Sequence, residues 1–261
     1  MSASPFVADV PALETIALSV RFGGVEALSD VSLKINASGL TGLIGPNGAG
    51  KSTFVDAVTG FLKGNATGEV LVAGEAITRA SASQRMHLGL SRTWQSQELF
   101  EDLTVEDNLA VAASRLTVTR ALRDLARRPR QEASIDETLA LLGLQARARS
   151  RPRDLTQRER KLVGVGRAIV GRPRLAILDE PAAGLDRYET SWLGDRLAEV
   201  VTSGVPILLI DHDMALIMRV SDEVHVLTEG KLLASGSPDE IRTDDRVIDA
   251  YLGRSGSGGN S

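Results

Sequence analysis

Hydrophobic and polar positions follow two different periods along the chain, and together they predict a parallel α/β core. Stretches of alternating polar and apolar residues come first, at 14–20 and 27–35, and are typical of antiparallel strands. Afterwards short apolar runs and segments of helical period follow one another, as in βα units. Further strands are expected at 40–44, 69–73, 89–94, 175–178, 205–210, 223–227 and 231–234. Helices are expected at 54–62, at 105–143 with a break at Pro129, at 157–171, 187–202 and 215–220, and near Pro238 and Arg246.

The domain organisation follows from where this pattern begins, changes and ends. Residues 1–13 are small, polar and proline-containing, which predicts a loose lead-in, and residues 14–252 are expected to form one domain. Within it, a helical subdomain is expected at about 95–170, where the period turns helical. Residues 253–261 are rich in Gly and Ser and are expected to form a flexible tail.

Composition limits the classes of protein to which this chain can belong. With 43% hydrophobic and 25% charged residues among 261, it matches a globular chain and not a disordered or collagen-like one. The longest apolar run, 205–210, is too short to span a bilayer, and no signal peptide is expected. The absence of cysteine excludes disulfides and thiolate metal sites. Nine aromatic residues and a net charge of −4 argue against a base-stacking nucleic-acid binder.

Charge is distributed unevenly along the chain. Residues 115–174 contain 16 Lys and Arg against 6 Asp and Glu, although the whole chain is acidic. Such a basic block is typical of a solvated helical face, and it is also found on surfaces that meet phosphates, acidic lipids or a partner protein. Both interpretations stay open at this point.

A glycine-rich segment between a predicted strand and a predicted helix carries the strongest chemical signal. It has the pattern Gly-x4-Gly-Lys-Ser and comprises Gly45, Pro46, Asn47, Gly48, Ala49, Gly50, Lys51, Ser52 and Thr53. Glycines allow backbone N–H groups to surround phosphate oxygens at the positive end of a helix dipole. In this pattern Lys51 reaches the β- and γ-phosphates, and the Ser52 hydroxyl binds Mg²⁺. The alternative is a turn that only links strand and helix.

Two carboxylates follow the apolar strand 175–178 and complete this pattern. Ligands of α/β proteins bind at the carboxyl edge of the parallel sheet, so Asp179 is a candidate Mg²⁺ ligand. Glu180 is placed to polarise an attacking water as general base. Alternatively, one of the carboxylates only caps the helix after Pro181. The two motifs together predict a P-loop NTPase, and the absence of an Asn-Lys-x-Asp motif argues against a GTP-binding switch protein.

Three further polar residues, Gln95, Asp186 and His212, lie near the ends of predicted strands. Each is weak evidence by itself, because a lone Gln is usually a surface amide and a lone His is usually a structural residue of the core. Their order along the chain, relative to the two motifs above, gives them more weight.

In this order the motifs resemble those of the nucleotide-binding subunits of ABC transporters, over about residues 14–252. By this resemblance 45–53 is the Walker A motif and 175–180 is the Walker B motif, which implies that Asp179 holds Mg²⁺ and that Glu180 is the catalytic base. The other identified residues are the adenine-stacking Phe22, the Q-loop Gln95 as a further Mg²⁺ ligand, the D-loop Asp186 and the switch histidine His212.

A narrower resemblance is to the ATPases of branched-chain (hydrophobic) amino-acid uptake systems. The segments that carry it are 21–24, 92–95, 99–100, 103–109, 181–184, 211–214 and 247–253. Related systems for urea, amides or aromatic acids look alike, so the resemblance implies a branched-chain amino acid or a related small polar, amide or organic-acid solute. The ATPase does not touch the solute, and its sequence therefore does not name it.

One motif of the resembled family is altered in this chain. The signature loop, usually Leu-Ser-Gly-Gly-Gln or a close variant, aligns with Leu155, Thr156, Gln157, Arg158 and Glu159. Gln157 and Arg158 place side chains where glycine lets backbone N–H groups approach a phosphate, although the Thr156 hydroxyl and the Arg158 charge still allow weak contact. A homodimer would place this loop over both ATP sites. We therefore expect a heterodimer with a second ABC ATPase subunit whose signature is intact. The alternative is that the family tolerates this loop and that both sites hydrolyse ATP.

The resemblance implies a fold, cofactors and partners. The fold is α/β, a RecA-like P-loop NTPase core with an N-terminal antiparallel β subdomain and an inserted α-helical subdomain. ATP and Mg²⁺ are the expected cofactors, and hydrolysis would drive two membrane permease subunits, with residues 96–106 in contact with a permease. An extracytoplasmic solute-binding protein would supply the solute, and the chain would lie peripherally on the cytoplasmic face of the cell membrane. No nucleic-acid partner is expected.

Two other functions remain open from the sequence alone. One is a soluble ABC ATPase that acts on nucleic acid or ribosomes; such proteins usually add a second ATPase domain or a long coiled coil, and this sequence has neither. The other is a module that binds ATP with little turnover, against which the presence of Glu180 argues.

Overall fold

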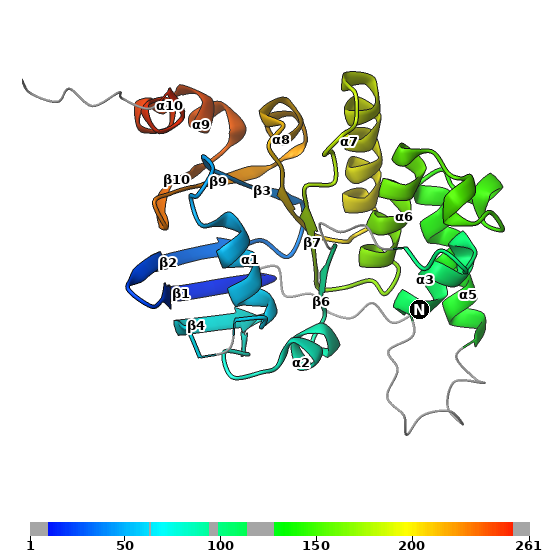
Figure 1. The fold of residues 1–261 in the computed structure, drawn as a ribbon, viewed down its shortest axis with the longest axis horizontal. Coiled ribbons are helices and arrows are strands. Elements are labelled where there is room, and N and C mark those ends of the chain that lie inside the picture. Colours follow the sequence, from blue (N-terminus) through cyan, green and yellow to red (C-terminus); the bar gives the residue numbers. More distant parts are fainter. Residues whose placement is uncertain (1–9, 63, 94–98, 114–127, 253–261) are drawn as a thin grey trace, which may run out of the picture.

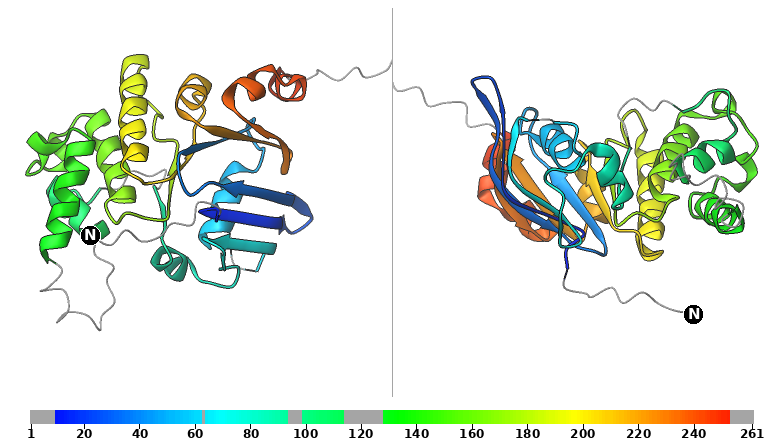
Figure 2. Two further views of the ribbon diagram at one scale, coloured as in Figure 1. Left: turned by 180° about the vertical axis from the view of Figure 1, so that it is seen from behind. Right: turned by 90° about the horizontal axis from the view of Figure 1, so that it is seen from below.

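The structure is a computed structural model that describes residues 10–62, 64–93, 99–113 and 128–252. Two β-sheets lie next to each other, and a separate group of helices lies to one side of them (Figure 1). Figure 2 shows the same arrangement from behind and from below. Among the described residues, no helix is both long enough and apolar enough to cross a membrane.

The first sheet is antiparallel and has the strand order β2-β1-β4-β5. Its strands are β1 (Leu13–Phe22), β2 (Val25–Ile35), β4 (Ala66–Val72) and β5 (Glu75–Ala76). Alternation of polar and apolar residues turns one face inward, where Val20 and Val31 are buried in the same cluster as Phe54 of the following helix. This alternation is the signal that predicted the two long strands, and the structure confirms them.

The second sheet is six-stranded and has the order β10-β9-β3-β8-β7-β6. Its strands are β3 (Leu40–Ile44), β6 (Leu90–Arg92), β7 (Leu175–Asp179), β8 (Ile207–Ile210), β9 (Glu223–Thr228) and β10 (Lys231–Gly236). Its neighbouring strands are parallel except for the β9–β10 hairpin. Every residue of β3, β7 and β8 is buried, which explains their continuous apolar sequences. The carboxyl ends of these three strands therefore meet at one edge.

The helices form two groups. Around the sheets lie α1 (Lys51–Thr59), α2 (Ala82–His87), α7 (Arg187–Thr202), α8 (Met214–Val220), α9 (Pro238–Thr243) and α10 (Asp245–Leu252). The side group contains α3 (Val105–Ala113), α5 (Arg128–Leu141) and α6 (Gln157–Ile169), with 3₁₀ turns at Gln145–Arg147 and Pro152–Asp154 (Figure 2). A Cβ at Gly166 of α6 would lie 2.8 Å from a methyl carbon of Leu109 in α3. This glycine therefore lets the two helices pack closely.

The structure confirms most of the predicted elements and corrects some of them. Helix α7 has the predicted bounds, and each expected strand is present. In the stretch 105–143 the structure describes α3 and α5, and Pro129 lies inside α5, so the break expected at Pro129 is wrong; residues 114–127 lie outside the described ones. The sequence pattern missed β5 and α2, because elements of 2 and 6 residues are too short to show a period.

Candidate nucleotide site

The glycine-rich loop connects β3 to α1, and three glycines determine its shape. Gly45, Gly48 and Gly50 have φ values of 153°, 80° and 100°, which residues with side chains rarely adopt. A Cβ at Gly45 would lie 2.1 Å from the carbonyl oxygen of Leu227, and one at Gly50 would lie 2.8 Å from that of Ala27. The loop therefore packs against neighbouring backbone. Helix α1 then begins after Gly50 without a side-chain cap.

Lys51 is the first residue of α1, and its side chain turns back over the loop. Its Nζ donates hydrogen bonds to the carbonyl oxygens of Gly45, at 2.6 Å, and Pro46, at 3.1 Å. Burial lowers the pKa of this amine, and the nearby carboxylates of Glu180 and Asp179 oppose that shift. The amine is thus held between the loop and the two carboxylates at the end of β7.

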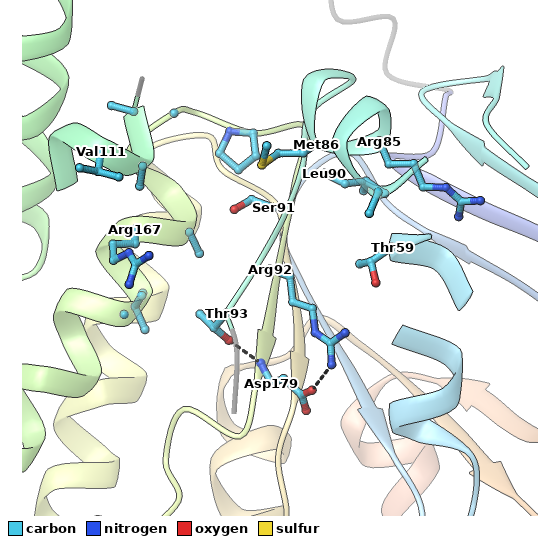
Figure 3. Close-up of a pocket in the computed structure, with 18 of the residues that line it drawn as sticks. Thr59, Arg85, Met86, Leu90, Ser91, Arg92, Thr93, Val111, Arg167 and Asp179 are labelled. Atoms are coloured by element: carbon cyan, nitrogen blue, oxygen red, sulfur yellow. Dashed lines mark hydrogen bonds and ion pairs between the residues drawn. The ribbon is translucent and has the colours of Figure 1, made fainter. Parts of the chain in front are cut away.

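Asp179 ends β7 and is held from two directions. Its backbone N–H donates to Thr93 Oγ1 at 2.9 Å, and its Oδ2 accepts from the Arg92 guanidinium at 2.9 Å (Figure 3). Burial raises the pKa of this carboxyl, whereas Arg92 favours its ionised form. The sequence pattern had assigned no site role to Arg92 or Thr93; their position at the carboxyl end of a strand is the signal that indicates one.

Glu180 follows Asp179 in a left-handed backbone conformation, with a φ of 51°. Its backbone N–H donates to the carbonyl oxygen of Ile210 at 2.7 Å, which ties it to the end of β8. Its Oε1 lies 2.7 Å from Nε2 of His212. Such a φ is strained for a residue with a side chain, and strain of this kind is concentrated at functional sites. The structure therefore brings the predicted base and the predicted switch histidine into direct contact.

Asp186 caps the helix that follows Pro181. Its Oδ1 accepts the backbone N–H of Glu189 at 2.8 Å, and Glu189 Oε2 accepts that of Asp186 at 3.2 Å. The start of α7 is thus capped by its own residues, and the carboxylates of Asp179 and Glu180 have other partners. The alternative in which one of them serves only as a helix cap does not hold.

A buried carboxylate that the sequence pattern missed organises the turn after β8. Asp211 accepts the backbone N–H groups of Ala182 and Asp213, each at 3.0 Å. It thereby joins the turn after β7 to the turn after β8. The side chain of His212, between these turns, is 55% exposed and accessible to a ligand. An acidic residue directly after an apolar strand was the available signal for Asp211.

Of the two remaining predicted residues, Phe22 and Gln95, the structure describes only Phe22. Phe22 ends β1 and is 43% exposed. The β1–β2 hairpin lies beside the glycine-rich loop, because Ala27 of β2 approaches Gly50. Gln95 lies outside the described residues.

The segment aligned with the signature loop forms the start of α6. Thr156 Oγ1 accepts the backbone N–H of Glu159 at 3.2 Å, and Glu159 Oε2 accepts that of Thr156 at 2.8 Å. Glu159 also pairs with Arg147 at 2.8 Å. The Arg158 guanidinium lies over the Trp192 ring, 4.9 Å from its centroid. Side chains therefore occupy N–H groups at this helix start, and the Arg158 charge is engaged with an aromatic ring of α7.

Several side chains of the basic block form ion pairs. Within its described part, the pairs are Arg147 with Glu159, Arg153 with Asp154, Arg160 with Glu101 and Arg172 with Glu137. Pairing of this kind is typical of a solvated helical face. The role of the whole block stays a prediction.

Oxygen donors at the carboxyl edge suit Mg²⁺. The hydroxyl of the exposed Ser52 and the carboxylate of Asp179 are hard ligands of the kind that Mg²⁺ prefers. Across the described ranges, no group of three or more His, Asp or Glu could hold a metal ion. Mg²⁺ would therefore need phosphate oxygens and waters as well, which is its usual coordination beside nucleotides.

A phosphate loop shaped by glycine, with two carboxylates at the same sheet edge, defines a P-loop NTPase. Solved structures agree with this class. The chain matches the ADP conformation of an ATP-binding cassette of an ABC transporter with a TM-score of 0.79 and 28% identity, covering 93% of this chain and 99% of that one. It matches a nucleotide-free ATP-binding cassette with a TM-score of 0.77 and 26% identity, over the same shares.

Sequence comparisons identify the family. The ABC transporter model matches residues 28–183, and the model of the branched-chain amino acid ATP-binding cassette transporter matches residues 231–256. The chain is 36% identical to the high-affinity branched-chain amino acid transport ATP-binding proteins LivG of Escherichia coli and BraF of Pseudomonas aeruginosa, covering 93% of this chain and 98% of each relative. The chain belongs to the ATP-binding proteins of ABC transporters, in the branch of the branched-chain amino acid cassettes, and is an ATPase coupled to transport.

These findings confirm the resemblance and the fold class inferred from the sequence. The family works with membrane permease components and associates peripherally with the membrane. Nothing in these comparisons supports the alternative of an ATPase that acts on nucleic acid or ribosomes.

Proposed function

We propose that this chain binds Mg·ATP at the edge formed by β3, β7 and β8 and hydrolyses it with Glu180 as general base. The observation that carries this proposal is the 2.7 Å contact between Glu180 and His212 at that edge. A carboxylate oriented in this way can accept a proton from an attacking water. The exposed imidazole of His212 would orient the water and the γ-phosphate.

The phosphates would be held by Lys51 and by backbone N–H groups of the glycine-rich loop. The Lys51 amine bonds to neutral carbonyl oxygens of Gly45 and Pro46, and anionic phosphate oxygens would be stronger, charge-assisted partners. The proposed Mg²⁺ ligands are Ser52, Asp179 and Gln95, and the proposed adenine-stacking residue is Phe22. When bound, the metal neutralises charge on the β- and γ-phosphates.

The proposed ATPase partner is a second ABC subunit with an intact signature. At the start of α6 the N–H groups of Thr156 and Glu159 are taken up by the capping pair that these two residues form, and Glu159 adds negative charge where a phosphate would come. Loss of one oriented donor typically slows hydrolysis about 10²-fold or more. The hydrolytic site would therefore combine this chain's P-loop, Glu180 and His212 with the partner's signature. The partner's own P-loop would face Thr156–Glu159 and turn over little.

The permease is proposed to dock between α2, β6 and the side group of helices. A cavity of about 1010 Å³ lies there, and Figure 3 shows residues that line it. Large apolar side chains around it are exposed: Phe61, Met86, Phe100 and Val111. Exposed apolar surface of this kind is typical of a protein contact. The expected footprint, 96–106, overlaps this surface, and its residues 96–98 lie outside the described ones.

Hydrogen exchange in the assembled complex tests this docking surface. Peptides from α2 and from 99–106 should be protected when the permeases are present, whereas peptides from α9 should not change. No protection at 99–106 would contradict the footprint.

The transported solute is proposed to be a branched-chain amino acid or a related small polar, amide or organic-acid compound. Similarity to transport ATPases of this class over 93% of the chain supports it. The chain would lie on the cytoplasmic face of the cell membrane, bound to two permeases, with an extracytoplasmic solute-binding protein delivering the solute.

Reconstitution tests the whole function. The chain, its partner ATPase and the permeases are placed in proteoliposomes with the binding protein, and ATP-dependent uptake of leucine, valine and urea is compared. Uptake of leucine and valine but not urea is expected. Uptake of urea alone would contradict the amino-acid class. An ATPase stimulated by nucleic acid or ribosomes, without any uptake, would contradict the transport function.

A further inference from the structure

One guanidinium joins the candidate Mg²⁺ ligand to the helix of the phosphate loop. Arg92, the last residue of β6, lies 2.9 Å from Asp179 Oδ2 and 2.5 Å from Asp56 Oδ1. Figure 3 shows its side chain directed at Asp179. Asp56 belongs to α1 and Asp179 to β7, so Arg92 connects three elements at the site. The side chains of Arg92 and Asp179 are only 10% and 2% exposed, whereas that of Asp56 is 36% exposed.

Arg92 places a permanent positive charge between the two carboxylates of this cluster. A guanidinium stays protonated in proteins, so the pair of carboxylates is opposed by one permanent positive charge. Without it, Asp56 and Asp179 would lose the guanidinium that pairs with both, and the amine of Lys51 would be the positive charge that remains near Asp179. Such an arrangement of hard oxygens attracts divalent cations.

We propose that Arg92 is a positioning residue that keeps a divalent cation from binding at Asp179 before the nucleotide arrives. This inference rests on the proposed role of Asp179 as a Mg²⁺ ligand. Arg92 bonds to Oδ2 of Asp179 and so fixes the direction of the other carboxylate oxygen. A positive charge at hydrogen-bond distance from the ligand also repels a second cation. The phosphate oxygens of ATP supply the negative charge that overcomes this repulsion, so cation and nucleotide bind together.

The same short segment controls both the backbone and the side chain of Asp179. Thr93 Oγ1 accepts the Asp179 N–H at 2.9 Å, and the Thr93 N–H donates to the carbonyl oxygen of Ile177 at 2.9 Å. The backbone and the hydroxyl of Thr93 therefore hold the end of β6 against β7 through bonds that do not involve the guanidinium. Replacing the Arg92 side chain should leave this strand pairing in place.

The test is Mn²⁺ binding to the full-length protein without nucleotide, measured by electron paramagnetic resonance. Arg92→Met should bind Mn²⁺ about tenfold more tightly than wild type or better, because it removes the guanidinium that pairs with both carboxylates. Arg92→Lys keeps the charge and should remain near wild type. The double variant Arg92→Met with Asp179→Asn should lose this increase in Mn²⁺ affinity.

Asp56→Asn is a second variant, and it is expected to lower the affinity for Mn²⁺ rather than raise it. Its side chain is partly exposed, so its replacement disturbs the core less than loss of the Arg92 side chain. It leaves the full charge of Arg92 to Asp179, and Mn²⁺ affinity in the presence of ATP should fall severalfold. If Arg92→Met does not fold, Asp56→Asn still tests the proposed role of Arg92.

Three results would overturn the proposal. They are a folded Arg92→Met protein with no gain in Mn²⁺ affinity, a gain that survives Asp179→Asn, and an unchanged affinity in Asp56→Asn. Asp179→Asn alone addresses the underlying assignment. If that variant binds Mg·ATP as tightly as wild type, the role of Asp179 as a metal ligand is wrong, which is a different failure.

Discussion

The starts of α1 and α6 are the two places where this chain is expected to meet ATP, and they are built differently. Helix α1 begins after Gly50 without a side-chain cap, at the end of a loop whose glycines have positive φ. Helix α6 begins after Thr156 with a capping box completed by Glu159. Both helices have a dipole with its positive end at the start, so the dipole does not distinguish them. The difference lies in the first N–H groups, which a phosphate can reach only where no side chain holds them.

Other helices of the chain show which of the two starts is ordinary. In the described part of the chain, α2, α7 and α9 also begin with a capping box. The start of α6 is thus capped like the starts of these other helices. The start of α1 is uncapped and follows glycines, as expected for a phosphate site. A helix N-terminus alone is therefore a poor indicator of nucleotide binding.

The largest expected effect comes from removing the base on the α1 side. Glu180→Gln keeps the size of the side chain but cannot accept a proton, so turnover should fall about 10²-fold or more while ATP binding is retained. Single-turnover hydrolysis and nucleotide binding in the assembled complex measure this. Glu189→Gln, which alters only the cap of α7, is the matched control and should keep turnover near wild type. Loss of ATP binding in Glu180→Gln would contradict the assignment of Glu180 as the general base.

The same substitution in the proposed partner ATPase tests the difference between the two sites. In the proposed heterodimer, the partner's equivalent glutamate would act at the site that faces the capped start of α6, so its replacement should change turnover by about twofold at most. Equal, large losses from both substitutions would mean that both sites hydrolyse ATP. A purified homodimer of this chain that is as fast as the assembled complex would also contradict the asymmetric interpretation.

A smaller effect is expected on binding. Lys51→Ala removes the charge that is proposed to face the β- and γ-phosphates, so ATP affinity should fall about tenfold or more. Titration with a fluorescent nucleotide measures the affinity. Lys231→Ala removes an exposed lysine of β10 and serves as the control. Equal affinities of Lys51→Ala and wild type would show that the amine does not reach the phosphates.

The smallest effect is expected at the start of α6. Thr156→Ala removes the cap of this helix, so the free energy of unfolding should fall by about 1 kcal/mol. Urea denaturation measures the stability. Turnover of the assembled complex should stay within about twofold of wild type, because the proposed hydrolytic site uses the partner's signature. A large loss of turnover would show that Thr156 takes part in hydrolysis after all.

Much of the site could be predicted because its parts are local in the sequence. The glycine pattern at 45–53 lies between an apolar run and a helical segment, and each of these needs only near neighbours to be identified. Asp179 and Glu180 directly follow the buried strand that delivers them to the sheet edge. Strands with clear alternation, such as β1 and β2, were predicted for the same reason.

Which distant residues meet depends on the packing of the whole chain. Arg92 and Asp179 are 87 positions apart, and Glu180 and His212 are 32 apart, yet each pair is in hydrogen-bond contact. These contacts depend on the strand order β3-β8-β7-β6, which places the ends of separate βα units side by side. The period of a segment determines which face a residue occupies, whereas its partner across the sheet edge depends on how the whole core packs.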